Sequence, residues 1–190
     1  MGMSRGVDTI ITFRVLKLLT TAWEDQAAFK HGLIDDKGKR IKSVKPKTSE
    51  QRDSYTLLHK LVFNLKRIIE ILPGGKSKLA RYASALFLIK EHTGLTGTKL
   101  DKEVFKYLQE SGLLEEGLLE EFRPIVKLQN ERTYTLVRPM IINEEVDAER
   151  GDTMIQAVGK PAGKVYGVPI FRMYNVDKNQ MMHCSGHDLR

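Results

Sequence analysis

The segment "LPGGKSK" at residues 72–78 holds residue types that a phosphate-binding loop uses. Such a loop needs a glycine, four residues and then Gly-Lys-Ser or Gly-Lys-Thr after a strand, because backbone amides and a helix N-terminus converge there on the phosphates. The position five residues before Gly75 is Glu70, and the residues before the glycines have helical periodicity. We therefore interpret the segment as a turn in which Pro73 ends one helix and Ser77 caps the next, with no nucleotide cofactor.

A second set of candidate residues lies in "HCSGH" near the end of the sequence. His183, Cys184, His187 and the following Asp188 could offer ligands to zinc, and Cys184 could form a nucleophilic pair with a histidine. Structural zinc sites draw two ligand pairs from separated segments, and the sequence holds no second pair. We predict no metal and no catalytic residue here. A single cysteine also excludes an internal disulfide and fits a reducing compartment.

Two acidic clusters could chelate a divalent cation or do acid–base work. They consist of Glu115, Glu116, Glu120, Glu121 and of Glu144, Glu145, Asp147, Glu149. Neither adjoins a glycine-rich loop or a histidine at matching spacing, so solvated charge is the simpler interpretation. Without a catalytic constellation, we predict that the protein is not an enzyme and has no cofactor. An enzyme would need a pocket that the sequence does not reveal.

Positive charge is concentrated in one part of the chain. The net charge is +7, but residues 36–90 hold 14 lysines and arginines against four acids, and residues 99–122 hold three lysines against seven acids. The segment from Lys37 to Lys47 has six cations and no anion. Such a surface can neutralise phosphates. The residues predicted to bind a polyanion are Lys37, Lys39, Arg40, Lys42, Lys45, Lys47, Arg52, Lys60, Lys66 and Arg67.

The partner of this basic surface stays open at the level of sequence. Aromatic residues are not interleaved with these cations, so contact with nucleic acid would involve phosphates and no readout of sequence. An acidic surface of another protein would fit the same charges, and a solubilising or intersubunit face is a further interpretation.

Apolar periodicity predicts a helical first part. Residues 8–19 have apolar side chains around most of a helix, which predicts a buried helix. Thr21 and Glu24 form a capping pair for a second helix that Gly32 ends, with Trp23 as a core anchor. Residues 35–47 then form a basic connector, solvated and mobile unless a polyanion orders it.

The strongest periodicity follows that connector. Residues 48–72 predict one helix of nearly seven turns capped by Thr48, and residues 79–89 predict an antiparallel neighbour that ends near Gly94. Thr98 and Asp101 have the spacing to open a further helix, which Gly112 stops.

After Pro124 the periodicity changes to that of short strands. The predicted strands are residues 133–137, 139–142, 152–158, 164–175 and 180–185. The expected fold class is therefore α+β, with an N-terminal helical bundle over residues 1–124 followed by a small, antiparallel, barrel-like β unit over residues 125–190. Such a unit is small for independent stability, so we expect it to pack on the helices.

Two long segments carry a resemblance to a known group of proteins. "TFRVLKLLTTAWEDQAAFKHGLIDDKGKR" and "LHKLVFNLKRIIEILPGGKSKLARYASALFLIKEH" resemble a family of short proteins encoded by large tailed bacteriophages, over about residues 9–93. The closing "VYGVPIFRMYN" followed by "GHDL" is similar in style to the β ending of such proteins. The resemblance implies a virion or head-assembly component, and it assigns a role to no residue.

These observations give an expected function. The chain is expected to be a non-enzymatic phage structural or assembly protein whose basic face docks DNA or an acidic protein partner, with an accessory factor of phage replication or transcription as the alternative. The chain has no run of about 18 apolar residues, and "MGMSRGVDT" lacks the apolar core of a signal peptide. The expected location is the virion or the host cytoplasm, with no membrane contact and with a homo-oligomer as one option.

Overall fold

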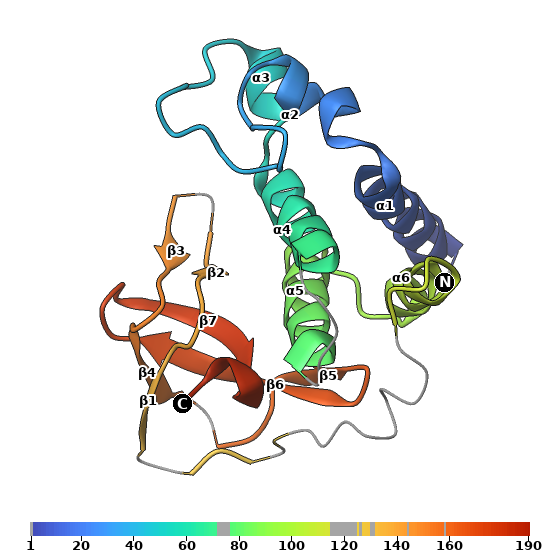
Figure 1. Cartoon of the computed structure of the whole chain (residues 1–190). Coiled ribbons are helices and arrows are strands. Elements are labelled where there is room, and N and C mark those ends of the chain that lie inside the picture. Colours follow the sequence, from blue (N-terminus) through green and yellow to red (C-terminus); the bar gives the residue numbers. More distant parts are fainter. Residues whose placement is uncertain are drawn as a thin grey trace.

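The computed structural model describes residues 2–71, 77–114, 125, 127–129, 132–143, 145–157 and 159–190. Helices come first and antiparallel strands follow, which confirms the α+β class (Figure 1). The helical elements before the strands are α1 (Gly2–Thr20), η1 (Trp23–Asp25), α2 (Ala27–Lys30), α3 (Ser49–Asp53), α4 (Leu57–Ile71), α5 (Ser77–Thr93) and α6 (Lys99–Glu110). Within this described part, no helix is both long and apolar enough to cross a bilayer.

Helix α5 lies at the centre of the molecule. It packs along α4, and its other side contacts β5, β6, β7 and the 3₁₀ turn η2 (Gly186–Asp188). Helix α1 packs against α4 and α6 on the side away from the sheet (Figure 1). The largest side chain buried in α5 is Tyr82, and Leu79, Leu86 and Ile89 are also fully buried. The helix is therefore shared between the helical and the β parts.

The prediction that the first helix is buried on most sides was wrong. Val15 and Leu19 are buried, but Ile10 is 69% exposed and Phe13 is 68% exposed. Among the described elements, α1 makes its main contacts with α4 and α6, and these leave Ile10 and Phe13 exposed.

The prediction of one continuous helix over residues 48–72 was also wrong. Thr48 caps the short helix α3 through a complete capping box with Gln51. The Ser54 hydroxyl then donates to the Gln51 carbonyl (2.8 Å), and the Thr56 hydroxyl lies 2.9 Å from Nδ1 of His59. These local hydrogen bonds compete with the helical ladder, so a break separates α3 from α4.

Capping predictions had mixed outcomes. Gly32, Gly94 and Gly112 have φ of +69°, +71° and +65°, so all three end helical segments as predicted. The predicted cap by Thr21 and Glu24 is wrong, because the Thr21 hydroxyl donates to the Lys17 carbonyl (2.7 Å) and the segment after it is a 3₁₀ turn followed by the four-residue α2. The predicted cap by Thr98 is wrong as well, because its backbone (φ −101°, ψ 7°) is not in the extended region of an N-cap, and Asp101 is paired with Lys90.

The strands lie in the predicted ranges, most of them shortened, except that residues 147–148 form a strand that was not predicted. They are β1 (Thr133–Thr135), β2 (Met140–Ile141), β3 (Asp147–Ala148), β4 (Thr153–Gln156), β5 (Gly163–Val165), β6 (Val168–Asn175) and β7 (Gln180–Ser185). The main sheet has the order β1-β4-β6-β5, with β7 on the other edge of β6, and β2 pairs with β3 in a separate hairpin.

One predicted strand is in fact a tight hairpin. Val165 of β5 pairs with Val168 of β6, so Tyr166 and Gly167 form a two-residue turn. Both turn residues have positive φ, +51° and +76°, as a hairpin of this length requires. The continuous run of apolar residues in "KVYGVPIFRMYN" concealed this turn from the sequence prediction.

The end of the chain closes the sheet on itself. The backbone groups of Thr135 and Arg190 exchange two hydrogen bonds (2.9 and 3.0 Å), and Leu136 forms a bridge with Leu189. The last residues, which follow β7, thus pair with the segment that continues β1. The closure depends on η2, where the buried carboxylate of Asp188 accepts hydrogen bonds from Arg138 (2.7 Å) and Ser84 of α5 (2.8 Å).

Candidate polyanion interface

The basic connector folds as an ordered projection at one end of the molecule (Figure 1). We call residues 33–53 the basic lobe. The lobe rests on a small hydrophobic core of its own, in which Leu33 and Ile34 are buried with Trp23 of η1 and Phe63 of α4. The rings of Trp23 and Phe63 meet edge to face at 5.3 Å. The expectation of a solvated connector did not anticipate this core.

A carboxylate shapes the tip of the lobe. Oδ1 of Asp35 accepts hydrogen bonds from the backbone amides of Lys37 (3.0 Å) and Lys39 (2.8 Å). The Asp35 amide in turn donates to the Lys39 carbonyl (2.9 Å). The hydrogen bond from the Lys39 amide is the main cause that lowers the pKa of Asp35. The turn therefore fixes the backbone positions from which two predicted cations extend.

The lobe also depends on a glycine. Gly38 has φ of +70°, and a Cβ at this position would lie 2.3 Å from the Trp23 ring. A side chain is therefore excluded both by backbone conformation and by space. Gly38 lets the loop lie flat on the indole.

Arg40 is one of the predicted polyanion ligands, and it binds the inside of the lobe. Its guanidinium donates to the carbonyls of Leu33 (2.9 Å), Ile41 (2.5 Å) and Val44, and it lies over the Tyr55 ring at 5.4 Å. These contacts occupy the donors of the guanidinium with backbone acceptors. The side chain holds the loop closed, so its place is structural.

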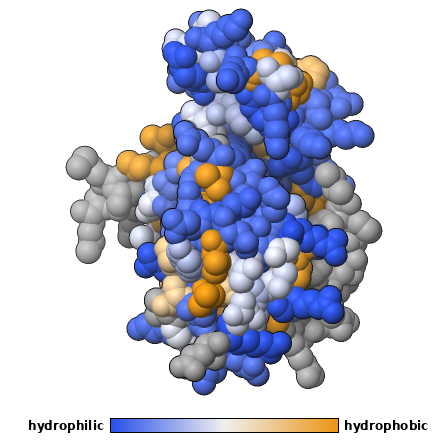
Figure 2. Space-filling view, turned by 90° about the vertical axis from the view of Figure 1, so that its left-hand side faces the viewer, coloured by the Kyte–Doolittle hydropathy of each residue, from blue (hydrophilic) through white to orange (hydrophobic). Residues whose placement is uncertain are grey.

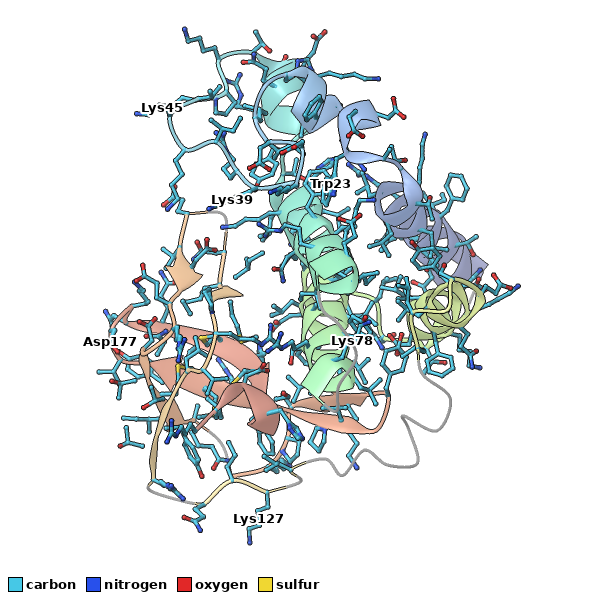
Figure 3. All side chains as sticks on the ribbon, viewed as in Figure 1. Trp23, Lys39, Lys45, Lys78, Lys127 and Asp177 are labelled. Atoms are coloured by element: carbon cyan, nitrogen blue, oxygen red, sulfur yellow. The ribbon has the colours of Figure 1, made fainter. Side chains whose placement is uncertain are left out.

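Six of the predicted cations lie exposed on the lobe. They are Lys37, Lys39, Lys42, Lys45, Lys47 and Arg52. Figure 3 shows Lys45 at the outer edge of the lobe, pointing away from the molecule, and Trp23 beneath the lobe beside α4. The same end of the molecule is mostly hydrophilic in the space-filling view of Figure 2. All six therefore lie in solvent on one short segment of the chain.

The three predicted cations on α4 do not join that surface. Lys66 is 7% exposed, and its Nζ donates to the carbonyls of Leu19 and Thr21 at 3.0 Å each, where it caps the end of α1. Lys60 pairs with Asp147 of β3 at 2.8 Å. Arg67 is half-buried on the same helix. A cation satisfied by carbonyls or a carboxylate has little left for a phosphate.

The other candidate sites are dispersed. Residues 72–76 of the glycine-rich segment and residues 115–121 with Glu144 lie outside the described residues. Nζ of Lys78, in the same motif, donates to the Leu113 carbonyl at 3.2 Å. Cys184 is buried in the core of the β unit, where burial raises the pKa of its thiol well above the ordinary value. Across the described residues, no three His, Cys, Asp or Glu side chains gather as a metal site.

Two grooves bring together residues that the sequence did not single out. The larger, of about 620 Å³, lies between α4, α5 and the β unit, where His183 pairs with Glu91 at 3.0 Å. The second, of about 550 Å³, lies between α6 and the β5–β6 turn. Lysines and aromatic residues both line the second groove. The segment "DKEVFK" already holds two of the lysines and a phenylalanine, but the negative net charge of residues 99–122 gave no reason to expect a cationic site there.

Comparisons with known proteins add no relative. No family model matches the chain, and neither the curated proteins nor the solved structures gave a match. The functional argument therefore depends on the geometry of this chain and on the sequence resemblance given above.

Proposed function

We propose that this chain is a non-enzymatic structural or assembly protein of a tailed bacteriophage, whose basic lobe contacts the phosphates of DNA. The observation that carries the proposal is the set of six exposed cations on an ordered loop. The phage setting rests on the resemblance of residues 9–93 alone.

The construction of the lobe favours binding to a regular polyanion. The Asp35 turn, Gly38 on Trp23 and the inward contacts of Arg40 order the backbone before any ligand arrives. A preordered loop loses less conformational entropy on binding than a flexible one. Only the lysine side chains then need to be ordered against the phosphates.

Residues 33–53 include no aromatic side chain on which a base could stack. The nearby aromatic residues, Trp23, Tyr55 and Phe63, belong to the core beneath the lobe or to the Arg40 contact. Long lysine side chains contact phosphates as point charges. Binding through this surface should therefore be independent of sequence and strongly dependent on salt.

The test is duplex DNA binding across a salt series. Replacing Lys39, Lys42 and Lys45 with glutamine removes three exposed charges without touching Arg40. If all three contact phosphates, the slope of log affinity against log salt should flatten by about 3. A matched control replaces Lys17, Lys127 and Lys160, which are exposed outside the lobe.

The control should retain the slope of the unaltered protein. No binding at low salt, or equal losses in the two variants, would overturn the DNA proposal and point to an acidic protein partner. Sedimentation with finished particles then separates a virion component from an accessory factor of replication or transcription, which would stay in the lysate.

A further inference from the structure

The groove between α6 and the β5–β6 turn has the size and composition of a small-molecule site. Its volume of about 550 Å³ lies within the usual range for ligand pockets. Phe105 of α6 and Tyr166 of the turn line it, with their ring centroids 5.5 Å apart. Both rings are only partly buried, so part of their surface faces the groove.

The tyrosine wall is held rigidly. Tyr166 has a positive φ of +51°, which is uncommon for a bulky residue. Its hydroxyl donates to the Asp101 carbonyl of α6 at 2.9 Å, and burial raises its pKa. The strained turn is thereby fastened to the helix, and the ring stays in the groove.

Three exposed cations surround the aromatic wall. Lys102 and Lys106 lie one turn apart on α6, and Lys164 extends from β5 on the other side. Lys106 pairs with Glu110 at 3.8 Å, with both side chains about two-thirds exposed, an arrangement that contributes little. The groove therefore presents positive charge to an anion that enters it.

A buried ion pair adjoins the groove. Asp101 is 8% exposed, and its Oδ2 accepts a hydrogen bond from Lys90 at 2.7 Å. Lys90 also neutralises the carboxylate, so it would not repel a nearby anion strongly.

From these features we infer that the groove binds a nucleotide, with the base against Phe105 and Tyr166 and the phosphate near Lys102, Lys106 and Lys164. Inorganic phosphate would leave the aromatic wall unused, and a purely apolar ligand would leave the lysines unused. A nucleotide uses both groups at once. It can enter as a free molecule or as an unstacked nucleotide of a single strand.

Calorimetric titration of the full-length protein with deoxyadenosine monophosphate, a ten-residue oligodeoxyadenylate and inorganic phosphate tests the inference. We expect saturable binding of the monophosphate and at least about tenfold weaker binding of inorganic phosphate. In the variant with Lys39, Lys42 and Lys45 of the lobe replaced, which reduces binding of the oligomer elsewhere, equal affinity per nucleotide for the monophosphate and the oligomer indicates a free nucleotide, and a much tighter oligomer indicates a strand.

Two variants locate the binding. Phe105→Leu keeps an apolar side chain but removes the aromatic face. The second variant replaces Lys102, Lys106 and Lys164 with glutamine and so removes the three exposed cations. Each should weaken monophosphate binding by about tenfold or more. The triple substitution in the basic lobe (Lys39, Lys42 and Lys45) serves as the charge-matched control and should leave this affinity unchanged.

Three results would overturn the inference: no saturation at millimolar monophosphate, inorganic phosphate binding as tightly as the monophosphate, or an affinity that the groove lysines do not affect. Because the lobe and groove variants alter different residues, failure here leaves the DNA proposal standing, and the reverse also holds. Circular dichroism of the lysine variant, whose changes are all at the surface, shows that a loss of binding is not a loss of folding.

Discussion

The basic lobe and the α6–β5 groove both display lysines, but they use aromatic residues in opposite ways. In the lobe, Trp23 and Phe63 are buried under the loop and give it shape, while the exposed residues of the loop include six cations and three acids but no aromatic ring. In the groove, Phe105 and Tyr166 stay partly exposed between the cations. The first arrangement suits a repeated phosphate backbone, and the second suits a single flat ring that carries a phosphate.

The comparison teaches that charge density along a sequence is a poor guide to binding geometry. The lobe comes from the most basic segment of the chain, and α6 comes from an acidic one. Lys102 and Lys106 nevertheless meet Lys164, because the β5–β6 turn packs against α6 through Tyr166 and Phe105. A site assembled from distant segments has a local charge that no sequence window reports.

The largest expected effect is a loss of stability caused by a substitution in the basic lobe. Gly38→Ala places a Cβ 2.3 Å from Trp23 at a backbone φ of +70°. We expect a loss of about 4 kcal/mol in unfolding free energy, from the strain of the left-handed conformation and from the clash with the indole. Chemical denaturation measures the loss. In whatever fraction stays folded, DNA binding should weaken while nucleotide binding by the groove persists.

Gly32→Ala is the matched control for that change. Gly32 has nearly the same φ, +69°, but a Cβ there meets nothing within 4 Å. It should cost about 1 kcal/mol. Equal losses for the two alanines would show that the Trp23 contact does not support the lobe.

A smaller expected effect is a dependence of stability on pH. His59 of α4 lies beneath the lobe against Phe63, with ring centroids 5.9 Å apart. Burial, together with the positive charge of Arg14, lowers its pKa from 6.5 to about 4. Because the folded pKa is below the unfolded one, stability is full above pH 6.5 and falls as the pH drops toward 4.

The expected loss across that window is about 3 kcal/mol. Denaturation at a series of pH values, compared with His59→Gln, isolates the contribution of this residue. The variant should have a flatter profile between pH 6.5 and 4. Parallel profiles would mean that His59 titrates normally in the folded protein. The fluorescence of Trp23 should change as the packing around Phe63 is lost, since the indole lies in the same hydrophobic cluster as Phe63.

The smallest effect concerns the groove. Tyr166→Phe removes the hydroxyl that donates to the Asp101 carbonyl at 2.9 Å but keeps the ring. We expect a loss of about 1 kcal/mol in stability, the usual contribution of one hydrogen bond. Thermal denaturation measures it. The DNA affinity of the lobe should not change. A change would show that the lobe and the groove are energetically coupled.

Much of the fold could be predicted from local sequence signals. Gly32, Gly94 and Gly112 end helical segments because positive φ is easiest for glycine, and Thr48 caps α3 through Gln51. The strands follow the change of apolar period after Pro124. The break between α3 and α4 was missed, because the apolar stripe continues through Ser54 and Thr56 while their side chains compete for backbone and histidine partners.

Some predicted site residues support the fold while others face solvent, and local sequence does not distinguish the two groups. Arg40, Lys60 and Lys66 look in the sequence like the cations around them. The guanidinium of Arg40 nevertheless binds carbonyls inside its own lobe, and Lys60 and Lys66 bind a carboxylate and carbonyls of other elements. Nothing within a few residues of Lys66 indicates that the end of α1 will lie beside it. The spacing of cations therefore located the lobe but could not separate its surface from its supports.

The amino-acid sequence by itself determined the α+β class, the places where helices end and the presence of a strongly basic segment, because caps, glycines and apolar period act over a few neighbouring residues. The tertiary structure alone decided which cations face solvent and where aromatic rings line a surface. Those properties depend on which distant segments pack together, as Trp23 with Gly38 and Tyr166 with α6 do. Packing sets burial, and burial decides whether a charged side chain supports the fold or remains available to a ligand.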